Sequence, residues 1–249
     1  MTPQVHYVLR LADTNLVLAQ RLGEWVGHAP ALEEDLGLAN VALDLLGQAR
    51  LLLAHAGRLE GEGRGEDELA YLREESEYFN LTLVEQPNGD FGDTVMRQFL
   101  FDAWQSALYE ALSHSQDATL AAIAAKGLKE AAYHLRYSGG WLVRLGGGTP
   151  ESHARVERSL RELWPFTNEL FDDDETDRAV AAAGIGVPPS ALLPTWSAQV
   201  DETLARATLV RPAPAQFAWF GKQGRHSEHL GYLLAEMQSL HRAHPGATW

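Results

Sequence analysis

The chain has 249 residues, of which 45% are hydrophobic and 22% are charged, so it can form one large domain with a substantial core. Its formal net charge of -14 makes nucleic acid and anionic membrane surfaces poor partners. It has no cysteine, which excludes disulfides, thiolate zinc sites, iron–sulfur clusters and a cysteine nucleophile. No signal-peptide pattern opens the chain, and no apolar stretch approaches the roughly 20 residues that cross a bilayer. We therefore expect a soluble cytoplasmic protein.

Four long helices are predicted in the first 148 residues, because apolar residues recur there at spacings of three and four. They cover residues 5–26, residues 32–59, residues 94–113, and a fourth stretch that opens at Asp117 or Thr119 and closes at Gly146–Gly148. Asp93 is the expected N-cap of the third helix, and the glycine run is a strong stop for the fourth. Between the second and third helices, residues 67–80 are predicted as a short charged helix and residues 86–90 as a turn.

Beyond Thr149 the helical pattern continues with interruptions. A helix over residues 150–171 is expected to break at Pro165. The acidic run 172–175 is interpreted as a solvated helix N-terminus, because it lacks the alternating ligands and closing glutamate of a calcium loop. Further helices are predicted at residues 194–208 and from Ser227 onward, separated by an irregular stretch at 210–225.

No strand or internal repeat is evident in the sequence, so the fold class is all-α. Four long helices in two pairs predict a ferritin-like four-helix bundle core with additional C-terminal helices. We expect one domain over residues 1–249, with the core bundle at about 5–148 and the accessory helices at about 150–249.

Each of the four long helices has one acidic residue near its middle, flanked by apolar residues. These residues are Asp13, Asp44, Asp102 and Glu130. In an antiparallel bundle, mid-helix residues come to one level, so all four carboxylates are candidates for a shared polar pocket. A ferritin-like di-iron site uses a carboxylate from each of two helices and Glu-x-x-His from each of the other two.

The second half of that motif is incomplete in this sequence. Gly47 stands three residues after Asp44, and Tyr133 stands three residues after Glu130. Carboxylates alone lack the nitrogen ligands that help to fix the geometry and potential of iron. His134 comes one position late, about 100° further round the helix, so we expect it to miss the cavity and to contact Glu130 at the surface.

Two interpretations of the four acids remain open. They are either the remnants of a degenerate di-iron site, with Tyr133 beside them, or ordinary polar residues on partly exposed faces. Acids that are buried together need cations, hydrogen bonds or shared protons. The candidate cations are Arg50, Arg97, Lys126 and Lys129, and the candidate hydrogen-bond donors are Tyr133, Gln48 and Gln20.

Several stretches along nearly the whole chain carry a resemblance to a known family. They are LGEWVGHAP at 22–30, LDLLGQAR at 43–50, VEQPNG at 84–89, KEAAYHLR at 129–136, EHLG at 228–231 and LAEMQ at 234–238. Each is weak alone, but together they are specific. The chain resembles the ferritin-like, non-catalytic C subunits of the bacterial phenylacetyl-CoA ring epoxidases.

The resemblance implies a multicomponent monooxygenase that inserts oxygen across the ring of phenylacetyl-CoA during aerobic phenylacetate breakdown. In that family a paralogous catalytic subunit holds the di-iron centre and binds the CoA thioester. A small bridging subunit and a reductase with flavin and an iron–sulfur cluster complete the system. The present chain is then expected to pair with the catalytic subunit as a scaffold, with no catalytic residue, metal or cofactor of its own. In isolation it could form a homodimer.

One basic cluster in this acidic chain precedes the last helix, and it contains Lys222, Arg225 and His226. The functional interpretation is contact with an anion, such as CoA phosphates, or with an acidic partner. The alternative is a solvated loop, which short basic runs usually form. A second hypothesis for the whole chain is a di-iron or di-manganese enzyme in its own right, with the four mid-helix acids as ligands.

Overall fold

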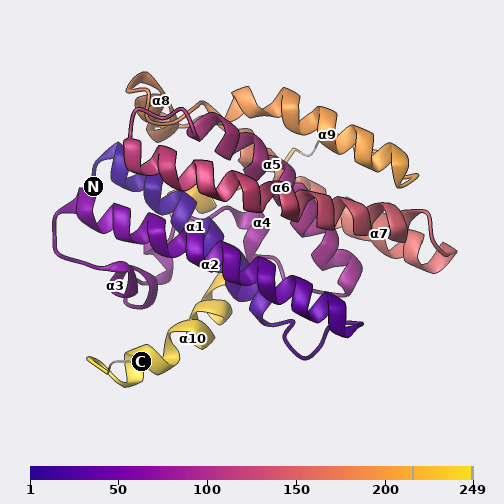
Figure 1. The fold of residues 1–249 in the computed structure, drawn as a ribbon, viewed down its shortest axis with the longest axis horizontal. Coiled ribbons are helices and arrows are strands. Elements are labelled where there is room, and N and C mark those ends of the chain that lie inside the picture. The colour runs from indigo at the N-terminus through magenta and orange to yellow at the C-terminus, as the bar shows by residue number, and fades with distance from the viewer. Residues whose placement is uncertain (215, 248–249) are drawn as a thin grey trace. The chain divides into compact units, whose positions relative to one another are not determined.

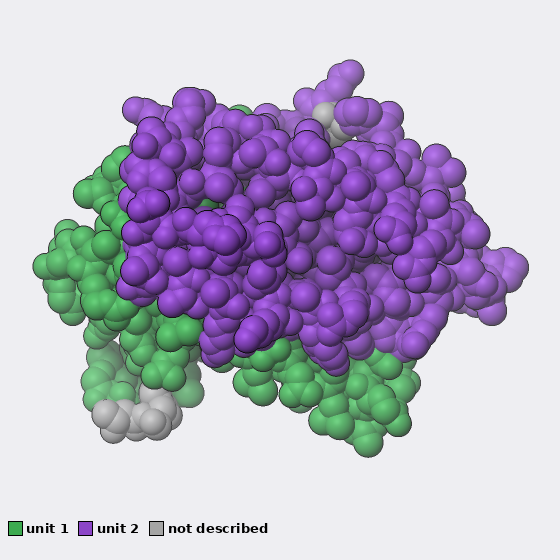
Figure 2. Space-filling view, turned by 45° about the horizontal axis from the view of Figure 1, so that its top comes forward, with its two compact units in different colours: residues 1–87, 220–249 green, residues 88–219 purple. Residues whose placement is uncertain are grey.

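The computed structural model describes residues 1–214 and 216–247, and within these residues it is all-α and contains no β-strand (Figure 1). Two compact units make up the chain, residues 1–87 with 220–249, and residues 88–219 (Figure 2). Each unit is built on one pair of long helices, as expected for the ferritin-like class. The predicted fold class is confirmed. The prediction of one domain, with a core bundle up to about residue 148 and accessory helices from about residue 150, stays a prediction.

The first unit contains the helix pair α1 and α2, joined by a short turn (Figure 1). Its elements are α1 (Pro3–Gly23), α2 (Leu32–Glu60), α3 (Glu66–Tyr71), η1 (Glu75–Glu77), α4 (Thr82–Glu85), η4 (Gly221–Gln223) and α10 (Glu228–Ala243). Thr2 caps α1 through its hydroxyl, and Gly61 ends α2 with a φ of 74°. Both long helices lie where the apolar spacing predicted them. Ser227 caps α10, as the prediction of a helix from that residue requires.

The prediction of one helix over residues 67–80 is wrong. The chain forms α3, turns, and then forms only the short η1 before residues 78–80 extend. Arg73, at the break, directs its guanidinium inward and donates to the backbone oxygens of Leu69 and Glu77. Tertiary bonding of this buried arginine therefore outweighs the local helical propensity of a charged segment.

The second unit contains the helix pair α5 and α6, and α7 and α9 pack against both of them. Its elements are α5 (Phe91–Leu112), α6 (Ala118–Gly146), α7 (Pro150–Leu163), η2 (Trp164–Phe171), α8 (Glu175–Ala182), η3 (Pro189–Leu192) and α9 (Leu193–Arg206). The helix predicted at 150–171 changes from α to 3-10 geometry at Trp164, directly before Pro165, as the proline requires. Asp174 caps α8, so the acidic run is a helix N-terminus as expected.

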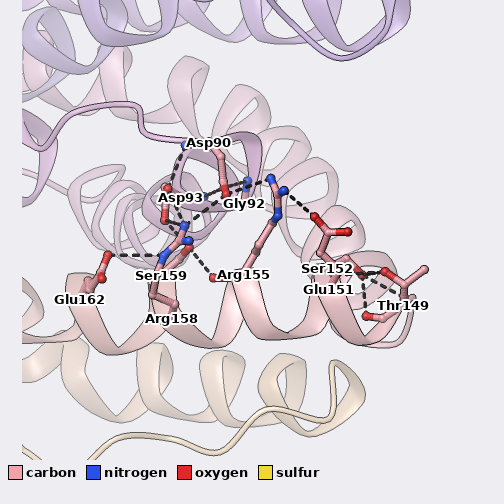
Figure 3. Close-up of polar contacts among 10 residues, drawn as sticks. All are labelled: Asp90, Gly92, Asp93, Thr149, Glu151, Ser152, Arg155, Arg158, Ser159 and Glu162. Carbon is pink, nitrogen blue, oxygen red and sulfur yellow. Dashed lines mark hydrogen bonds and ion pairs between the residues drawn. The ribbon is translucent and has the colours of Figure 1, made fainter.

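The helix α5 begins three residues earlier than predicted. Its N-cap is Asp90, whose side chain accepts hydrogen bonds from the backbone nitrogens of Gly92 and Asp93. Asp93, which was predicted to be the cap, is the N3 residue of a capping box and accepts from the Asp90 backbone nitrogen at 2.9 Å. Arg158 and Ser159 of α7 also bond to Asp93 (Figure 3). This capping network thereby joins α7 to the start of α5.

Close backbone contact fixes the C-terminal end of α6. A Cβ at Gly146 would lie 2.2 Å from the backbone oxygen of Ala207, which follows α9. The hydroxyl of Thr208 and the Nδ1 atom of His153 lie 3.3 Å and 2.8 Å from the backbone oxygen of Gly146. A larger residue at 146 would separate the ends of α6 and α9, which explains why glycine stands here.

The sequence was expected to contain no long apolar segment, but the helix α2 is one. By length and composition it could cross a membrane, although core helices of other proteins meet the same criterion. One face of α2 packs against α1, and only 39% of its most apolar window is buried. Much of its apolar surface is therefore exposed.

Candidate functional site

Asp13, the mid-helix acid of α1, is fully buried and paired with a cation. Its two carboxylate oxygens accept hydrogen bonds from the two terminal nitrogens of Arg73, one of them at 3.0 Å. The backbone nitrogen of Phe79 donates to the same carboxylate at 3.0 Å. Burial alone would lower the pKa of Arg73, but the negative charge of Asp13 and the hydrogen bonds raise it above its ordinary value. The buried carboxyl group of Asp13 is thus paired with a guanidinium.

Asp44, the corresponding acid of α2, is half-buried and lies beside the exposed Leu43. The hydrogen bonds of Asp13 come from Arg73 and from the backbone of Phe79. Within the first unit the structure therefore gives the two mid-helix acids different surroundings, one enclosed and charge-paired and the other at the surface.

Asp102, the mid-helix acid of α5, is fully buried among uncharged donors. Gln98 donates from its side-chain nitrogen to Oδ1 at 2.6 Å, and the hydroxyl of Ser138 on α6 donates to Oδ2 at 2.7 Å. Burial raises the pKa of Asp102 to about 6, against the lowering effects of His134, Ser138 and Gln98. This carboxyl therefore exchanges its proton near neutral pH, unlike an ordinary surface aspartate.

The remaining predicted residues on α6 are arranged differently from the prediction. Glu130 is partly exposed and lies 3.9 Å from the ammonium of Lys126, one turn earlier. Tyr133 is 49% exposed and packs beside the Arg136 guanidinium, which lies 5.9 Å from its ring centroid. The partners of Asp102 include neither Glu130 nor Tyr133.

The prediction that His134 lies at the surface is wrong. His134 is fully buried and acts electrostatically on Asp102. The buried residues of α6, which include Ala131 and Ser138, are spaced three and four apart from His134, so its helical face is the inward one. The stretch 129–136 therefore turns its histidine, and not its tyrosine, toward the core of the second unit.

These surroundings bear on whether the residues could hold iron. Among residues 1–214 and 216–247, no group of three or more histidine and carboxylate side chains is placed to bind a metal ion. The Arg73 guanidinium contacts both oxygens of Asp13, where a di-iron centre would need lone pairs directed at a cation. Gly47 and Tyr133 supply no imidazole at the expected positions. The donor set does not fit a di-iron centre.

A third enclosed carboxylate, Glu85 of α4, was not identified as a candidate from sequence. One of its oxygens lies 2.6 Å from Nδ1 of His226, and the other accepts from the backbone nitrogen and hydroxyl of Ser227. Nε2 of His226 lies 2.9 Å from the backbone oxygen of Tyr78, which can only accept. Both ring nitrogens thus face acceptors, so His226 is an imidazolium ion.

The electrostatics of His226 agree with this assignment. Burial alone would lower the pKa of His226, but the hydrogen bond and the charge of Glu85 raise it above its ordinary value. The side chains of His226 and Glu85 are 1% and 0% exposed. This pair therefore links the segment before α10 to α4 inside the first unit.

The basic cluster before α10 is largely internal. Lys222 is buried, and its backbone oxygen accepts from Nε of Arg10 at 3.0 Å. His226 is used in the pair with Glu85. Arg225 is exposed, with its guanidinium 3.9 Å from the ring centroid of Phe220. Of the three residues only Arg225 is exposed, and its contact with an anion or a partner stays a prediction. The interpretation as a solvated loop is wrong for His226 and Lys222.

Sequence reasoning missed the groups that satisfy the two buried aspartates. None of the four candidate cations bonds to Asp13; the cation is Arg73, sixty residues away. Its sequence surroundings are charged and polar, so no local signal marks it as buried. Gln98 could have been found, because it stands one helical turn before Asp102 and so shares its face.

With this geometry described, comparison with known proteins identifies the family. The chain belongs to the family described as "Phenylacetic acid catabolic protein", whose model matches residues 1–249. It is 54% identical over 243 residues to the C subunit of the 1,2-phenylacetyl-CoA epoxidase of Escherichia coli K12. The match covers 98% of this chain and 98% of that relative. A role in phenylacetate catabolism follows, as does membership of a multi-subunit system.

Proposed function

We propose that this chain is a non-catalytic structural subunit of a multicomponent di-iron monooxygenase that epoxidises the ring of phenylacetyl-CoA. In this proposal it pairs with the catalytic subunit in the cytoplasm and keeps that subunit in its active fold. The catalytic subunit would hold the iron and the CoA thioester, while a small bridging subunit and a flavin and iron–sulfur reductase deliver electrons. The name and the 54% identity of the Escherichia coli relative support the assignment to this system.

One observation carries the non-catalytic part of the proposal: Arg73 neutralises Asp13 with two hydrogen bonds. A guanidinium in this position supplies the positive charge that a metal ion would otherwise supply, and a second cation beside it would be repelled. The corresponding acid of the second unit, Asp102, is satisfied by Gln98 and Ser138. Asp13 and Asp102 therefore both have partners other than iron, which supports a structural role for the two residues.

The competing hypothesis is that the chain is itself a di-metal oxidase. Metal analysis separates the two. We expect the chain purified alone to contain well under one iron per chain, and the complex with the catalytic subunit to contain the iron in that subunit. Near-stoichiometric iron in the isolated chain, lost in an Asp13→Asn variant, would overturn the proposal.

A turnover experiment tests the same point in the intact complex. Glu130→Ala removes a partly exposed acid that a di-metal site would need as a ligand. Under the proposal, the assembled complex with this variant epoxidises phenylacetyl-CoA at the wild-type rate per complex. Abolished turnover with normal assembly and normal melting temperature would contradict it.

A further inference from the structure

The face of α2 that is not packed against α1 has an exposed apolar stripe. Its residues are Leu32, Leu36, Leu43 and Leu46, which are 70%, 56%, 64% and 43% exposed. Their spacings of four, seven and three place them on one side of the helix. A single exposed leucine is ordinary, but a contiguous row on one helix marks an interaction surface.

This stripe borders a hollow between α1 and α2, which we call the α1–α2 groove. Its volume is about 370 Å³, and most of its lining is apolar. The α1 and α2 helices contribute small residues to it, namely Ala19, Gly23, Ala39 and Ala42. Larger apolar side chains, Val26, Leu43 and Leu46, stand beside them. The small residues leave room for large side chains of a partner helix, and the exposed leucines can pack against the apolar face of that helix.

The acids next to the leucine stripe in the sequence are Glu33, which is exposed, and Glu34 and Asp44, which are partly exposed. Glu24, after α1, is also exposed but pairs with Arg21. The chain as a whole has a net charge of -14. An interface is favoured when potentials on the two sides are complementary. The groove therefore fits an apolar helix flanked by lysine and arginine.

We propose that the α1–α2 groove is the surface on which this chain pairs with the catalytic subunit, and that it receives an amphipathic helix of that subunit with an apolar stripe and basic flanks. The inference rests on the proposed function for the identity of the partner. The chemistry of the helix, however, follows from the groove alone: its leucines, its small residues and its acidic surroundings.

Two other occupants fit the groove less well. A second copy paired about a two-fold axis at Leu43 would bring the two neighbouring Asp44 side chains together, and like charges in contact are unfavourable. A bilayer would suit the composition of α2, but anionic lipids would be repelled by the same acids.

The main test compares two leucine variants in the binding of this chain to the purified catalytic subunit. Leu43→Lys places a cation in the apolar stripe, opposite a helix with basic flanks. Leu240→Lys is the matched control, because Leu240 is 55% exposed on α10 and does not line the groove. We expect the first variant to raise Kd at least about tenfold, as at interface hot spots, and the second to leave it unchanged. Both should melt like the wild type, since both leucines are exposed.

A charge variant tests the chemistry of the partner helix. Glu33→Lys reverses one exposed acid at the N-terminal end of α2. We expect this variant to slow association with the catalytic subunit severalfold at low ionic strength and to make Kd less dependent on salt. An association rate that is unchanged or faster would mean that the partner helix lacks basic flanks, and would overturn that part of the inference.

The possible outcomes distinguish this inference from the proposed function. If wild type and Leu43→Lys bind the catalytic subunit equally well, pairing uses another surface, and the inference fails while the proposed function stands. If the wild-type chain does not bind the catalytic subunit at all, the proposed function fails. If Leu43→Lys instead abolishes self-association in sedimentation velocity, or binding to phosphatidylglycerol vesicles, while pairing is unchanged, the groove has a different occupant.

Discussion

The two units solve the same electrostatic problem in different ways. Each has a fully buried aspartate near the middle of its first long helix, Asp13 in α1 and Asp102 in α5. Asp13 is paired with the opposite charge of Arg73. The hydrogen-bond donors of Asp102 are the uncharged Gln98 and Ser138, and burial disfavours its charge, which raises the pKa of Asp102 to about 6.

The difference shows which contacts the fold depends on. Removing one partner of a buried ion pair strongly destabilises the fold, because the other charge stays buried without an opposite charge. A carboxyl among neutral donors can instead take up a proton. The first unit should therefore be sensitive to mutation at its buried acid, and the second unit to pH.

The largest effect is expected from Arg73→Met, which leaves Asp13 buried without its cation. Loss of one partner of a buried pair costs about 3–5 kcal/mol in the free energy of unfolding. Chemical denaturation of the isolated chain measures this difference. Arg64→Met is the matched control: Arg64 forms an i,i+4 pair with Glu60 that is partly exposed, so we expect a loss of no more than about 1 kcal/mol.

A double variant distinguishes the effect of the buried charges on stability from the effect of side-chain volume. Asp13→Asn together with Arg73→Met removes both charges while retaining most of the volume. Replacement of a buried pair by uncharged groups is often close to neutral. The double variant should therefore be more stable than Arg73→Met alone. Equal stability would mean that Arg73 acts through its bonds to Leu69 and Glu77 and not through Asp13.

The next effect is expected from Asp102→Asn, and it depends on pH. The folded protein keeps a proton on Asp102 up to about pH 6, whereas the unfolded chain loses it near the ordinary pKa of 3.8. The contribution of Asp102 to stability therefore falls as pH rises from about 4 to 6, and then stays low. A shift of about two pKa units corresponds to about 3 kcal/mol.

Asparagine at 102 resembles the protonated aspartic acid and does not titrate. The variant should be more stable than the wild type by about 1 kcal/mol at pH 4.5 and by up to about 3 kcal/mol at pH 7.5. Denaturation at the two pH values gives the comparison, because titrating groups that do not act on Asp102 affect variant and wild type alike; His134, which does act on Asp102, is part of the measured effect. A stability difference that is the same at both pH values would contradict the raised pKa of Asp102.

The sequence predicted the helices much better than the groups that surround the acids. Apolar spacing located both long helix pairs, and Pro165 located the change from α7 to η2. These signals are local, since the periodicity of a helix and the effect of a proline act within one segment. The helix caps were predicted less accurately than the helices. Asp90 and Asp93 are both acids near the start of α5, and only the geometry of the turn shows which of them is the N-cap.

The surroundings of the acids depend on contacts between distant segments. Arg73 lies sixty residues from Asp13, and His226 lies 141 residues from Glu85. Helical phase alone places His134 on the inward face with Ala131 and Ser138, whereas the metal motif places Tyr133 there. Contacts within one helix are thus predictable from spacing, whereas the buried counter-charges required the tertiary structure.

The smallest effect is expected from His226→Gln, which extends the comparison to a third buried acid. Glu85, like Asp13, is neutralised by a cation, but this cation can lose its proton. The pKa of His226 is raised above its ordinary value of 6.5, so the stabilisation is complete below that pH and is lost as pH rises through the raised value. Glutamine keeps one donor and removes the charge, which should cost about 2 kcal/mol at pH 6, as for a hydrogen bond to a charged group.

The pH dependence decides whether the charge of His226 is what matters. At pH 9 the wild-type imidazole is closer to neutral, so the difference between wild type and His226→Gln should shrink. Denaturation at pH 6 and pH 9 measures it, with His229→Gln as a control from the same segment, since His229 is half-buried and outside the Glu85 cluster. A loss of stability that stays constant from pH 6 to pH 9 would show that the imidazole acts by packing and hydrogen bonding alone.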